Sequence, residues 1–386
     1  MKITQVYDIV NAANKMTLGE TTVLNQDLSN VVEIGKEILL DNERTTKWLG
    51  NINDKIGKMI FVDRVYAGRA PSVLMDAWEF GSIVEKVREE MPQASVNESW
   101  ELENGVSYDP NIFYGSKFHA KLFNKRVTFE VDRSLPEVQI QQAFSNASQM
   151  AAFISMRYTV VENALTVALD ELIMSTINNF TAEVIHANYG DEGLDTKTTA
   201  QAINLLYLYK QKNPTSTLTA ASCIEDPDFI RFAIYTINKT RYRLEGMSKV
   251  FNISHSEKFT PAEKLHYVAL ADFTEAATAF LQSDTYHKEL VALPNYDKVA
   301  YWQGSGMGYE FSEISKIDVK TASNDVVTAT GIIGVMFDRD ALGVSNLYRR
   351  TKTEYVAKAE FFNNFHKVDA GYFNDLDENF VVFFVA

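Results

Sequence analysis

The chain has 386 residues, of which 46% are hydrophobic and 12% aromatic, and its formal net charge is −14. This composition supports a packed core and excludes a disordered protein, and the length favours more than one folding unit. Because a net acidic chain gains little from counterion release, the charge argues against a generic binder of DNA or of anionic membranes.

Residues 1–60 show short helical patterns separated by loops. The stretches "DLSNVVEIGKEILL" and "NERTTKWLGNINDKI" have helical spacing but little amphipathic depth. We therefore expect an N-terminal arm that needs another surface to lie on. The next segment, "MIFVDRVYA" (59–67), predicts a strand.

Residues from about 93 to 126 are polar, and their charges are sorted by sign. Turn signals at Asn104-Gly105 and Asp109-Pro110 predict a hairpin. It is either a solvated hairpin with complementary arms or a projecting hairpin that lies across a neighbouring subunit. The scarcity of apolar residues favours contact with a partner. The acids of the outgoing half include Glu98, Glu101 and Glu103, and the lysines of the returning half are Lys117, Lys121 and Lys125.

A strand, "KRVTFEVDRS", is followed by a long helix. Residues 137–189 contain neither glycine nor proline, so nothing stops a helix from about Pro136 to Ile185. Ser134 and Glu137 predict a capping box at its start, and Gly190 allows its end.

The long helix carries a heptad-like apolar stripe, which predicts packing against a sheet. The stripe shifts after Leu172, which predicts a bend or a change of partner near Ile173–Ile177. Only six residues of 137–189 are charged, so we expect the helix to be covered on more than one side. The stripe includes Ile140, Phe144, Ile154, Val161, Leu165 and Leu172.

Beyond residue 190 the pattern is mixed, which together with the long helix predicts an α+β fold. Helices are predicted at 196–212, at 225–246 with Asp226 and Pro227 as cap and first-turn residues, and at 260–282 with a Thr260–Glu263 capping box. Strands are predicted around 298–304, 314–319 and 326–337, and the aromatic tail is strand-like with a turn at 374–379.

The sequence offers no convincing catalytic or metal-binding motif. "GSGMG" (304–308) lacks the Lys-Ser/Thr of a phosphate loop, and "DAGYFNDLDEN" (369–379) lacks calcium-loop spacing and predicts a solvated turn. The six histidines show no paired metal spacing, and the single cysteine, Cys223, has no activating neighbour and can form no intramolecular disulfide. We therefore predict no catalytic residue, metal or cofactor, and a protein that is not an enzyme.

With neither a signal peptide nor a membrane-spanning apolar run, we expect a soluble protein made in a reducing cytoplasm.

The order of parts resembles the major capsid proteins of tailed double-stranded DNA phages, which share the Hong Kong 97 phage-like capsid fold. Two stretches carry the likeness: "WEFGSIVEKVREEMPQA" (78–94), and "GIIGVMFDRDALGV" (331–344) with "AEFFNNFHKVDAGYFNDLDENFVVFF" (359–384). The resemblance implies an N-terminal arm (1–60), a P-domain strand with the extended E-loop (61–133) and a P-domain spine helix (134–190). It further implies an A-domain (191–345) and returning strands of both domains (346–386).

The function implied by this resemblance is that of a virion shell protein. Hexamers and pentamers would self-assemble in the host bacterial cytoplasm into an icosahedral head that encloses double-stranded DNA, with a neutral or acidic inner face. Scaffolding, portal and decoration proteins would be partners, and membrane would not be. No scaffold-like segment precedes residue 1, which favours a separate scaffolding protein. Some such shells cross-link a loop lysine to a neighbour's asparagine, but Asn363, Asn364 and Asn374 match no such position residue by residue. The alternatives are an encapsulin-like compartment, another phage head or tail protein, and a two-domain enzyme.

Overall fold

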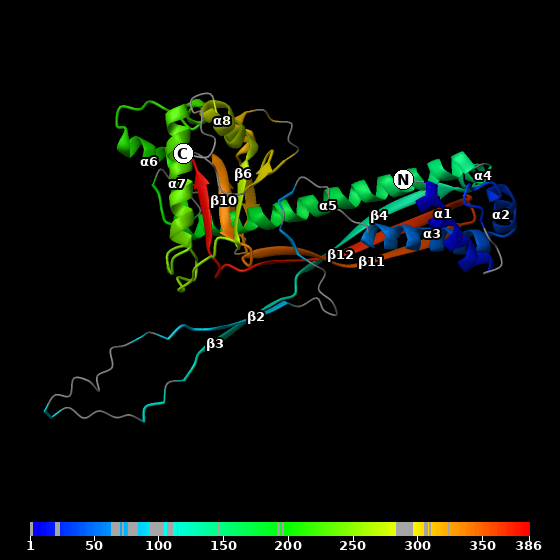
Figure 1. The fold of residues 1–386 in the computed structure, drawn as a ribbon, viewed down its shortest axis with the longest axis horizontal. Coiled ribbons are helices and arrows are strands. Elements are labelled where there is room, and N and C mark those ends of the chain that lie inside the picture. Colours follow the sequence, from blue (N-terminus) through cyan, green and yellow to red (C-terminus); the bar gives the residue numbers. More distant parts are fainter. Residues whose placement is uncertain are drawn as a thin grey trace.

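The computed structural model describes residues 3–19, 24–62, 70–71, 73–75, 84–92, 94, 104–105, 111–113, 115–145, 147–190, 194, 197–282, 296–304, 308, 310–322 and 324–386. The molecule is elongated (Figure 1). An α/β unit lies at one end, helices of the first 62 residues lie at the other, and the long helix α5 (Ala147–Tyr189) joins them. A hairpin of β2 (Val84–Glu89) and β3 (Phe118–Phe123) leaves the body near its middle.

The long helix is present, but it begins later than predicted. Strand β4 (Arg126–Pro136) runs into a short helix, α4 (Glu137–Ala143), and α5 starts only at Ala147. The predicted capping box is wrong, because Ser134 lies in β4 and its hydroxyl donates to Asn363 Oδ1 at 2.6 Å. The end is confirmed: α5 stops at Tyr189, and Gly190 has a φ of +68°.

The predicted change of partner along α5 is confirmed. Val161 and Leu165 pack with Val368 of the sheet beneath the helix. From Ile173 onward, buried residues such as Ile177 belong to the core of the α/β unit. Helix α5 therefore contributes buried side chains to two separate hydrophobic cores.

The sheet beneath α5 has the strand order β1–β11–β12–β4 among the described residues. Its long members are β11 (Leu342–Val356), which begins before the predicted boundary at residue 346, and β12 (Phe361–Asn374), and β1 (Leu74–Met75) pairs in parallel with β11. The predicted strand at 59–67 is wrong at its start, where residues 59–62 are helical, and residues 63–67 lie outside the described part.

The first helices are not a poorly supported arm. Helices α1 (Ile3–Leu18), α2 (Val31–Ile38) and α3 (Asn42–Val62) share a buried core with α4 and Phe362 of β12. Trp48 is fully buried, packs against the tilted ring of Phe144 with ring centres 4.7 Å apart, and donates to Asn14 Oδ1 at 2.7 Å. Gly35 of α2 sits under the Phe144 ring, where a Cβ would overlap it. The expectation of little amphipathic depth was wrong, since most of the described apolar side chains of these helices lie in this core.

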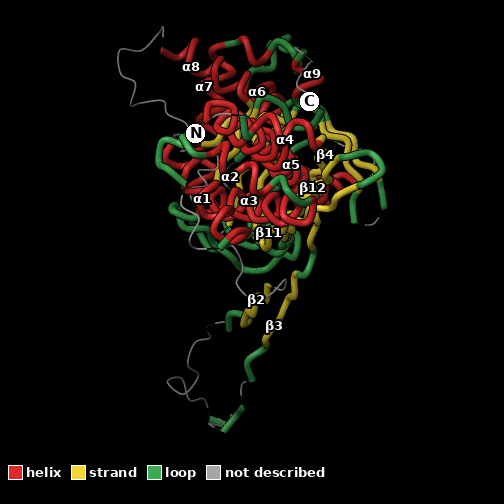
Figure 2. Tube along the Cα trace, turned by 90° about the vertical axis from the view of Figure 1, so that its right-hand side faces the viewer, coloured by secondary structure: helices red, strands yellow, loops and turns green. Residues whose placement is uncertain are grey.

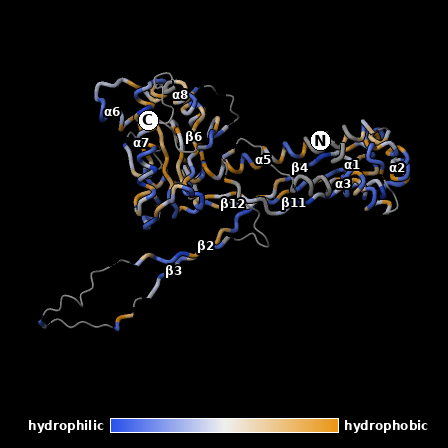
Figure 3. The backbone as a smooth tube through the Cα atoms, in the orientation of Figure 1, coloured by the Kyte–Doolittle hydropathy of each residue, from blue (hydrophilic) through white to orange (hydrophobic). Residues whose placement is uncertain are grey.

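The α/β unit at the other end contains a sheet with the described order β5–β13–β10–β6–β7. Figure 3 shows hydrophobic residues gathered in these strands. Side chains of β10 alternate between two cores, with Met336 toward α7 and α8 and Val335 toward α5, so both faces of the sheet are covered. The strands are β5 (Ala202–Asn204), β6 (Leu265–Leu270), β7 (Tyr296–Val299), β10 (Ile332–Asp338) and β13 (Phe380–Phe384), and a small pair is formed by β8 (Ile317–Lys320) and β9 (Val326–Ala329).

Two of the three helix predictions in this unit need correction. The cap of α7 is confirmed, because Asp226 Oδ1 accepts from Phe229 N at 2.7 Å with Pro227 at the first position. The helix predicted at 196–212 is only half present, since residues 202–204 form β5. The Thr260 capping box is wrong, because Thr260 Oγ1 accepts from Asn379 Nδ2 and a strand, β6, follows. The remaining helices are α6 (Leu205–Lys212), a short 3-10 turn η3 (Cys223–Glu225), α7 (Pro227–Leu244), α8 (Ala271–Gln282) and α9 (Phe311–Ile314).

None of the helices in the described part of the chain is both long and apolar enough to cross a membrane.

Candidate functional site: the base of the projecting hairpin

The hairpin is the part of the subunit that stands away from the body in two perpendicular views (Figures 1 and 2). β2 and β3 pair antiparallel from Val84 opposite Phe123 to Glu89 opposite Phe118. The paired base therefore starts at residue 84, earlier than the predicted start near 93. An isolated two-stranded hairpin is marginal in water, so the contacts of its two faces decide what holds it.

The face turned toward the body is cationic. Lys86 and Lys121 lie directly opposite each other across the strands, an arrangement that is destabilising without a counter-charge. Asp375, in the turn between β12 and β13, accepts from both lysines at 3.1 Å, and its side chain is only 4% exposed. Asp377 adds a second contact to Lys121 at 2.5 Å. The buried carboxylate of Asp375 thus neutralises both lysines. We call Lys86, Lys121 and Asp375 the clamp.

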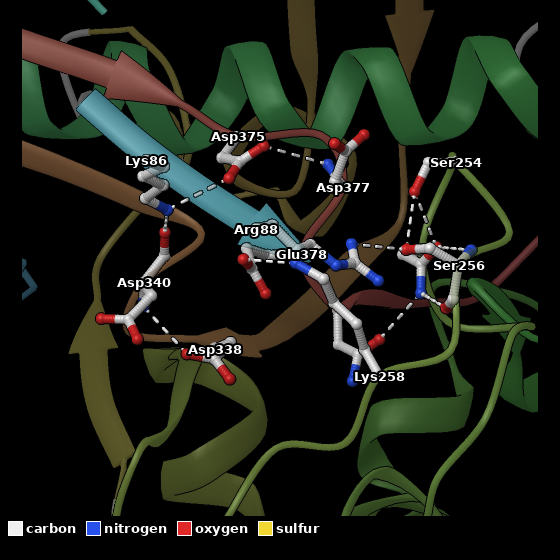
Figure 4. A network of polar contacts seen from close by, with 12 residues as sticks. Lys86, Arg88, Ser254, Ser256, Lys258, Asp338, Asp340, Asp375, Asp377 and Glu378 are labelled. Atoms are coloured by element: carbon white, nitrogen blue, oxygen red, sulfur yellow. Dashed lines mark hydrogen bonds and ion pairs between the residues drawn. The ribbon is translucent and has the colours of Figure 1, made fainter. Parts of the chain in front are cut away.

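Further contacts along the same face attach the hairpin to the α/β unit (Figure 4). The Lys86 ammonium also donates to the carbonyl of Asp340. The Arg88 guanidinium donates to Ser256 Oγ at 2.9 Å and to the Glu257 carbonyl at 3.3 Å. The ring of Phe123 packs against Phe373 of β12 at 5.3 Å.

The protonation of the clamp follows from these contacts. Burial of Asp375 opposes its charge, but Lys86 and Lys121 outweigh burial, so the pKa of Asp375 lies below its ordinary value. Burial of Lys121 likewise opposes its charge, but the hydrogen bonds to Asp377 and Asp375 prevail and raise its pKa. Both groups are charged at neutral pH, so the clamp is ionic.

The face turned away from the body carries exposed apolar side chains next to the exposed carboxylates of Glu85 and Glu89. Val87, Phe118 and Leu122 alternate with the clamp residues along the two strands, and each is 64–65% exposed. In a subunit that faced water on all sides, the apolar face of a sheet would turn inward and the lysines outward. This hairpin has the opposite arrangement.

The residues singled out from the sequence lie in different surroundings. Lys117 pairs with Glu90 at 3.6 Å, just beyond the end of β2, and Lys121 pairs with the 375–377 turn of its own chain. Lys125 is exposed between β3 and β4. The acids of the outgoing half, Glu98, Glu101 and Glu103, lie outside the described residues.

The sequence missed the partner of the clamp. The acidic stretch at 369–379 predicted a solvated turn, yet Asp375 is buried by the hairpin base. Its only signal was a cluster of acids in the tail and a cluster of lysines far away in the sequence. The tail asparagines proposed for cross-linking are engaged in their own subunit: Asn364 is fully buried, and Asn374 donates to the Thr176 carbonyl.

The described residues supply no group of three or more His, Cys, Asp and Glu placed to hold a metal ion. Burial raises the pKa of the Cys223 thiol to about 12, which keeps it protonated and unreactive at neutral pH. The hairpin base therefore has charged contacts to its own subunit on one face and exposed apolar side chains on the other.

Comparison with known proteins identifies the type of protein that carries this hairpin. The family model for the Phi29-like phage major capsid protein matches residues 10–384. The chain belongs to this family. It is a structural capsid protein, the repeating subunit of a phage virion shell.

Solved structures similar to this capsid protein share little sequence with it. The capsid structure of Staphylococcus phage Andhra is 8% identical with a TM-score of 0.46, covering 84% of this chain and 87% of that one. The capsid structure of Cyanophage P-SCSP1u is 11% identical with a TM-score of 0.43 over 84% and 92%. The capsid of Ralstonia phage GP4 is 10% identical with a TM-score of 0.40 over 81% and 87%. A search of curated proteins found no match to the sequence.

Proposed function

We propose that this capsid protein assembles into hexamers and pentamers of a closed head that encloses double-stranded DNA, and that the hairpin is its main lateral contact. The observation that carries the proposal is the set of three exposed apolar side chains, Val87, Phe118 and Leu122, on the hairpin face that points away from its own subunit. Exposed apolar surface of this kind marks a protein–protein contact. The role is structural and not catalytic, and assembly takes place in the host bacterial cytoplasm.

The clamp determines which face of the hairpin can contact a neighbouring subunit. The hairpin base is anchored by Asp375 on the lysine face, so the opposite face, with Phe118 and Leu122, remains available to a neighbouring subunit. A rigid anchor reduces the conformational entropy that is lost when the neighbour binds. Lys117 and Lys125, which are exposed, supply charged contacts at the rim of the same interface.

The net charge of −14 fits a shell that encloses DNA without binding its sequence. A neutral or acidic inner face avoids tight phosphate contacts, which would hinder packing and release. Scaffolding, portal and decoration proteins are the further partners proposed.

The decisive experiment compares assembly of two matched double variants. The hairpin variant is Phe118→Ser with Leu122→Ser, and the control is Val326→Ser with Tyr348→Ser, whose side chains are 58% and 62% exposed elsewhere on the subunit. Both variants should fold with unchanged helix content and thermal midpoint. Electron microscopy and sedimentation should show shells for the parent and the control, and at least tenfold fewer for the hairpin variant.

The assay uses the chain alone and with a scaffolding protein if its genome encodes one. Equal yields of shells from the hairpin variant and the control would remove the hairpin from the assembly contact. A parent chain that stays monomeric in every preparation would refute the proposed function itself.

A further inference from the structure

A groove on the α/β unit has the chemistry to receive the far end of a hairpin. It encloses 930 Å³ between α6, α7 and the residues after α7. Its walls present Phe232, Tyr235 and Tyr242, the last two of which are 56% and 69% exposed. Exposed aromatic side chains around a concavity are typical of a protein contact site.

The groove is also cationic in a strongly acidic protein. Lys212 lies 5.0 Å from the centre of the Phe232 ring, and Lys212 and Lys239 flank Tyr235 at 5.6 and 5.9 Å. Arg243 is a further lining residue, and no Asp or Glu is found among the described residues that line the groove. Among the ion pairs of the described chain, none involves these three cations. The groove therefore presents uncompensated positive charge beside aromatic faces.

The residues that connect β2 and β3 have the complementary composition. Residues 93–110 contain four carboxylates (Glu98, Glu101, Glu103 and Asp109) and no lysine or arginine, and they also contain Trp100 and Tyr108. Phe113, farther along the connection, is 92% exposed. An acidic, aromatic segment fits a cationic, aromatic groove through ion pairs and ring stacking.

The direction in which the hairpin projects favours an intermolecular contact. In both perpendicular views, β2 and β3 leave the body on the side away from α6 and α7 (Figures 1 and 2). A projection on one side and a groove on the other are the two halves of a head-to-tail contact, which forms a ring when the rotation between successive subunits closes. The 28 residues 90–117 allow each arm of the connection a reach of up to about 45 Å.

We propose that the acidic half of the hairpin of one subunit docks in the α6–α7 groove of the next subunit. The inference rests on the proposed shell function and names the acceptor surface for its lateral contact. The groove would then be filled in hexamers and pentamers and open in the free chain.

The test is a charge swap. The groove variant is Lys212→Glu, Lys239→Glu and Arg243→Glu, and the hairpin variant is Glu98→Lys, Glu101→Lys and Glu103→Lys. Each alone should lower the yield of shells at least tenfold, and the chain that combines all six substitutions should recover it. The matched control is Lys316→Glu, Lys320→Glu and Arg339→Glu, which changes the charge equally at exposed positions of the same unit and should assemble like the parent.

A cysteine pair provides a second measurement in assembled particles. A Phe113→Cys chain mixed with a Tyr235→Cys chain and treated with a bis-maleimide should give covalent dimers that neither chain gives alone, since the native Cys223 is buried. Shells without such dimers, or no recovery in the six-fold variant, would overturn this inference and leave the shell function standing. Normal shells from a groove variant that has lost binding of a fluorescent single-stranded oligonucleotide would overturn it in favour of a nucleic-acid site. A parent chain that forms no shells would overturn both proposals.

Discussion

The first helices and the hairpin differ in how they treat their apolar residues, although the sequence suggested that both depend on neighbours. Helices α1–α3 bury Trp48, Ile52 and most of their other described apolar side chains in a core shared with α4 and β12. The hairpin exposes Val87, Phe118 and Leu122 and buries the charged contacts of its base instead. The number of apolar residues in a segment therefore says less about independence than where the fold places them.

Because of this difference, changes in the two regions should affect different properties, namely the stability of the folded subunit and the assembly of the shell. A change in the N-terminal core should weaken the folded subunit, because buried contacts are lost within one chain. A change on the outward hairpin face should leave the subunit stable and weaken the shell. Substitutions in the two regions test the two sides of that separation.

The largest expected effect is on the N-terminal core. Trp48→Ala should lower the free energy of unfolding by about 3–5 kcal/mol, because it leaves a cavity next to Phe144 and removes the donor to the buried Asn14. Phe113→Ala, on the exposed hairpin, should change it by less than about 0.5 kcal/mol. Urea unfolding followed by circular dichroism measures both. Similar losses in the two variants would contradict the comparison.

A second large effect is expected in the helix that joins the two cores. Val161→Pro should cost about 3 kcal/mol or more, because proline removes a backbone hydrogen bond and clashes with the preceding turn of α5. Shell yield should fall before helix content does. Val161→Ala is the control, since it trims the same buried side chain and keeps the backbone bonded. If the proline variant assembles as well as the alanine variant, a continuous α5 is not required for the shell.

The elements that the sequence predicted correctly are those fixed by local chemistry. The absence of glycine and proline from residues 137–189 and the presence of Gly190 give most of α5 and its end. Asp226 and Pro227 give the start of α7. In each case the contacts that fix the helix boundary lie within a few residues of it, so the local sequence is enough to predict that boundary.

Most of the failures involve distant partners. Ser134 resembled a helix cap but bonds to Asn363 on the neighbouring strand, and Thr260 bonds to Asn379. The clamp joins Lys86 and Lys121 to a turn more than 250 residues later in the chain, a pairing without any local signal. Tertiary contacts of this kind override capping and charge patterns, and sequence spacing alone does not reveal them.

A moderate effect is expected at the clamp. Asp375→Asn keeps the shape of the side chain but leaves Lys86 and Lys121 opposed across the hairpin, which should cost about 1–3 kcal/mol. Trypsin should cut at Lys121 faster than in the parent. Asp340→Asn is the matched control, because only the carbonyl of Asp340 contacts the hairpin while its carboxylate pairs with Lys264. Equal cleavage in the two variants would show that the anchor does not depend on Asp375.

The same clamp should respond to acid. The pKa of Asp375 in the folded protein lies below the ordinary 3.8, so the folded state binds this proton more weakly than the unfolded state. Its contribution to stability is therefore complete above about pH 5 and is lost as the pH falls through the folded pKa. The difference in unfolding free energy between the parent and Asp375→Asn should be constant from pH 6 to pH 7 and shrink toward pH 3. A difference that stays constant down to pH 3 would contradict an ionic clamp.

The smallest effect on the folded subunit is expected at the exposed end of the same face. Lys117 and Glu90 form an ion pair at 3.6 Å with both side chains more than half exposed, and solvent and salt screen such a pair. The pKa of Glu90 lies below its ordinary value because of the hydrogen bond from His119 and the charge of Lys117, but this exposed group adds little to the fold. Lys117→Glu should therefore leave the urea midpoint unchanged while it lowers shell yield, most strongly at low salt, because the lysine would face a neighbouring subunit. Lys36→Glu, a charge change on the exposed side of α2, is the control and should affect neither measurement.

A shifted midpoint for Lys117→Glu would mean that even the end of the hairpin base contributes to the fold, and the separation between stability and assembly would then begin farther out along the hairpin.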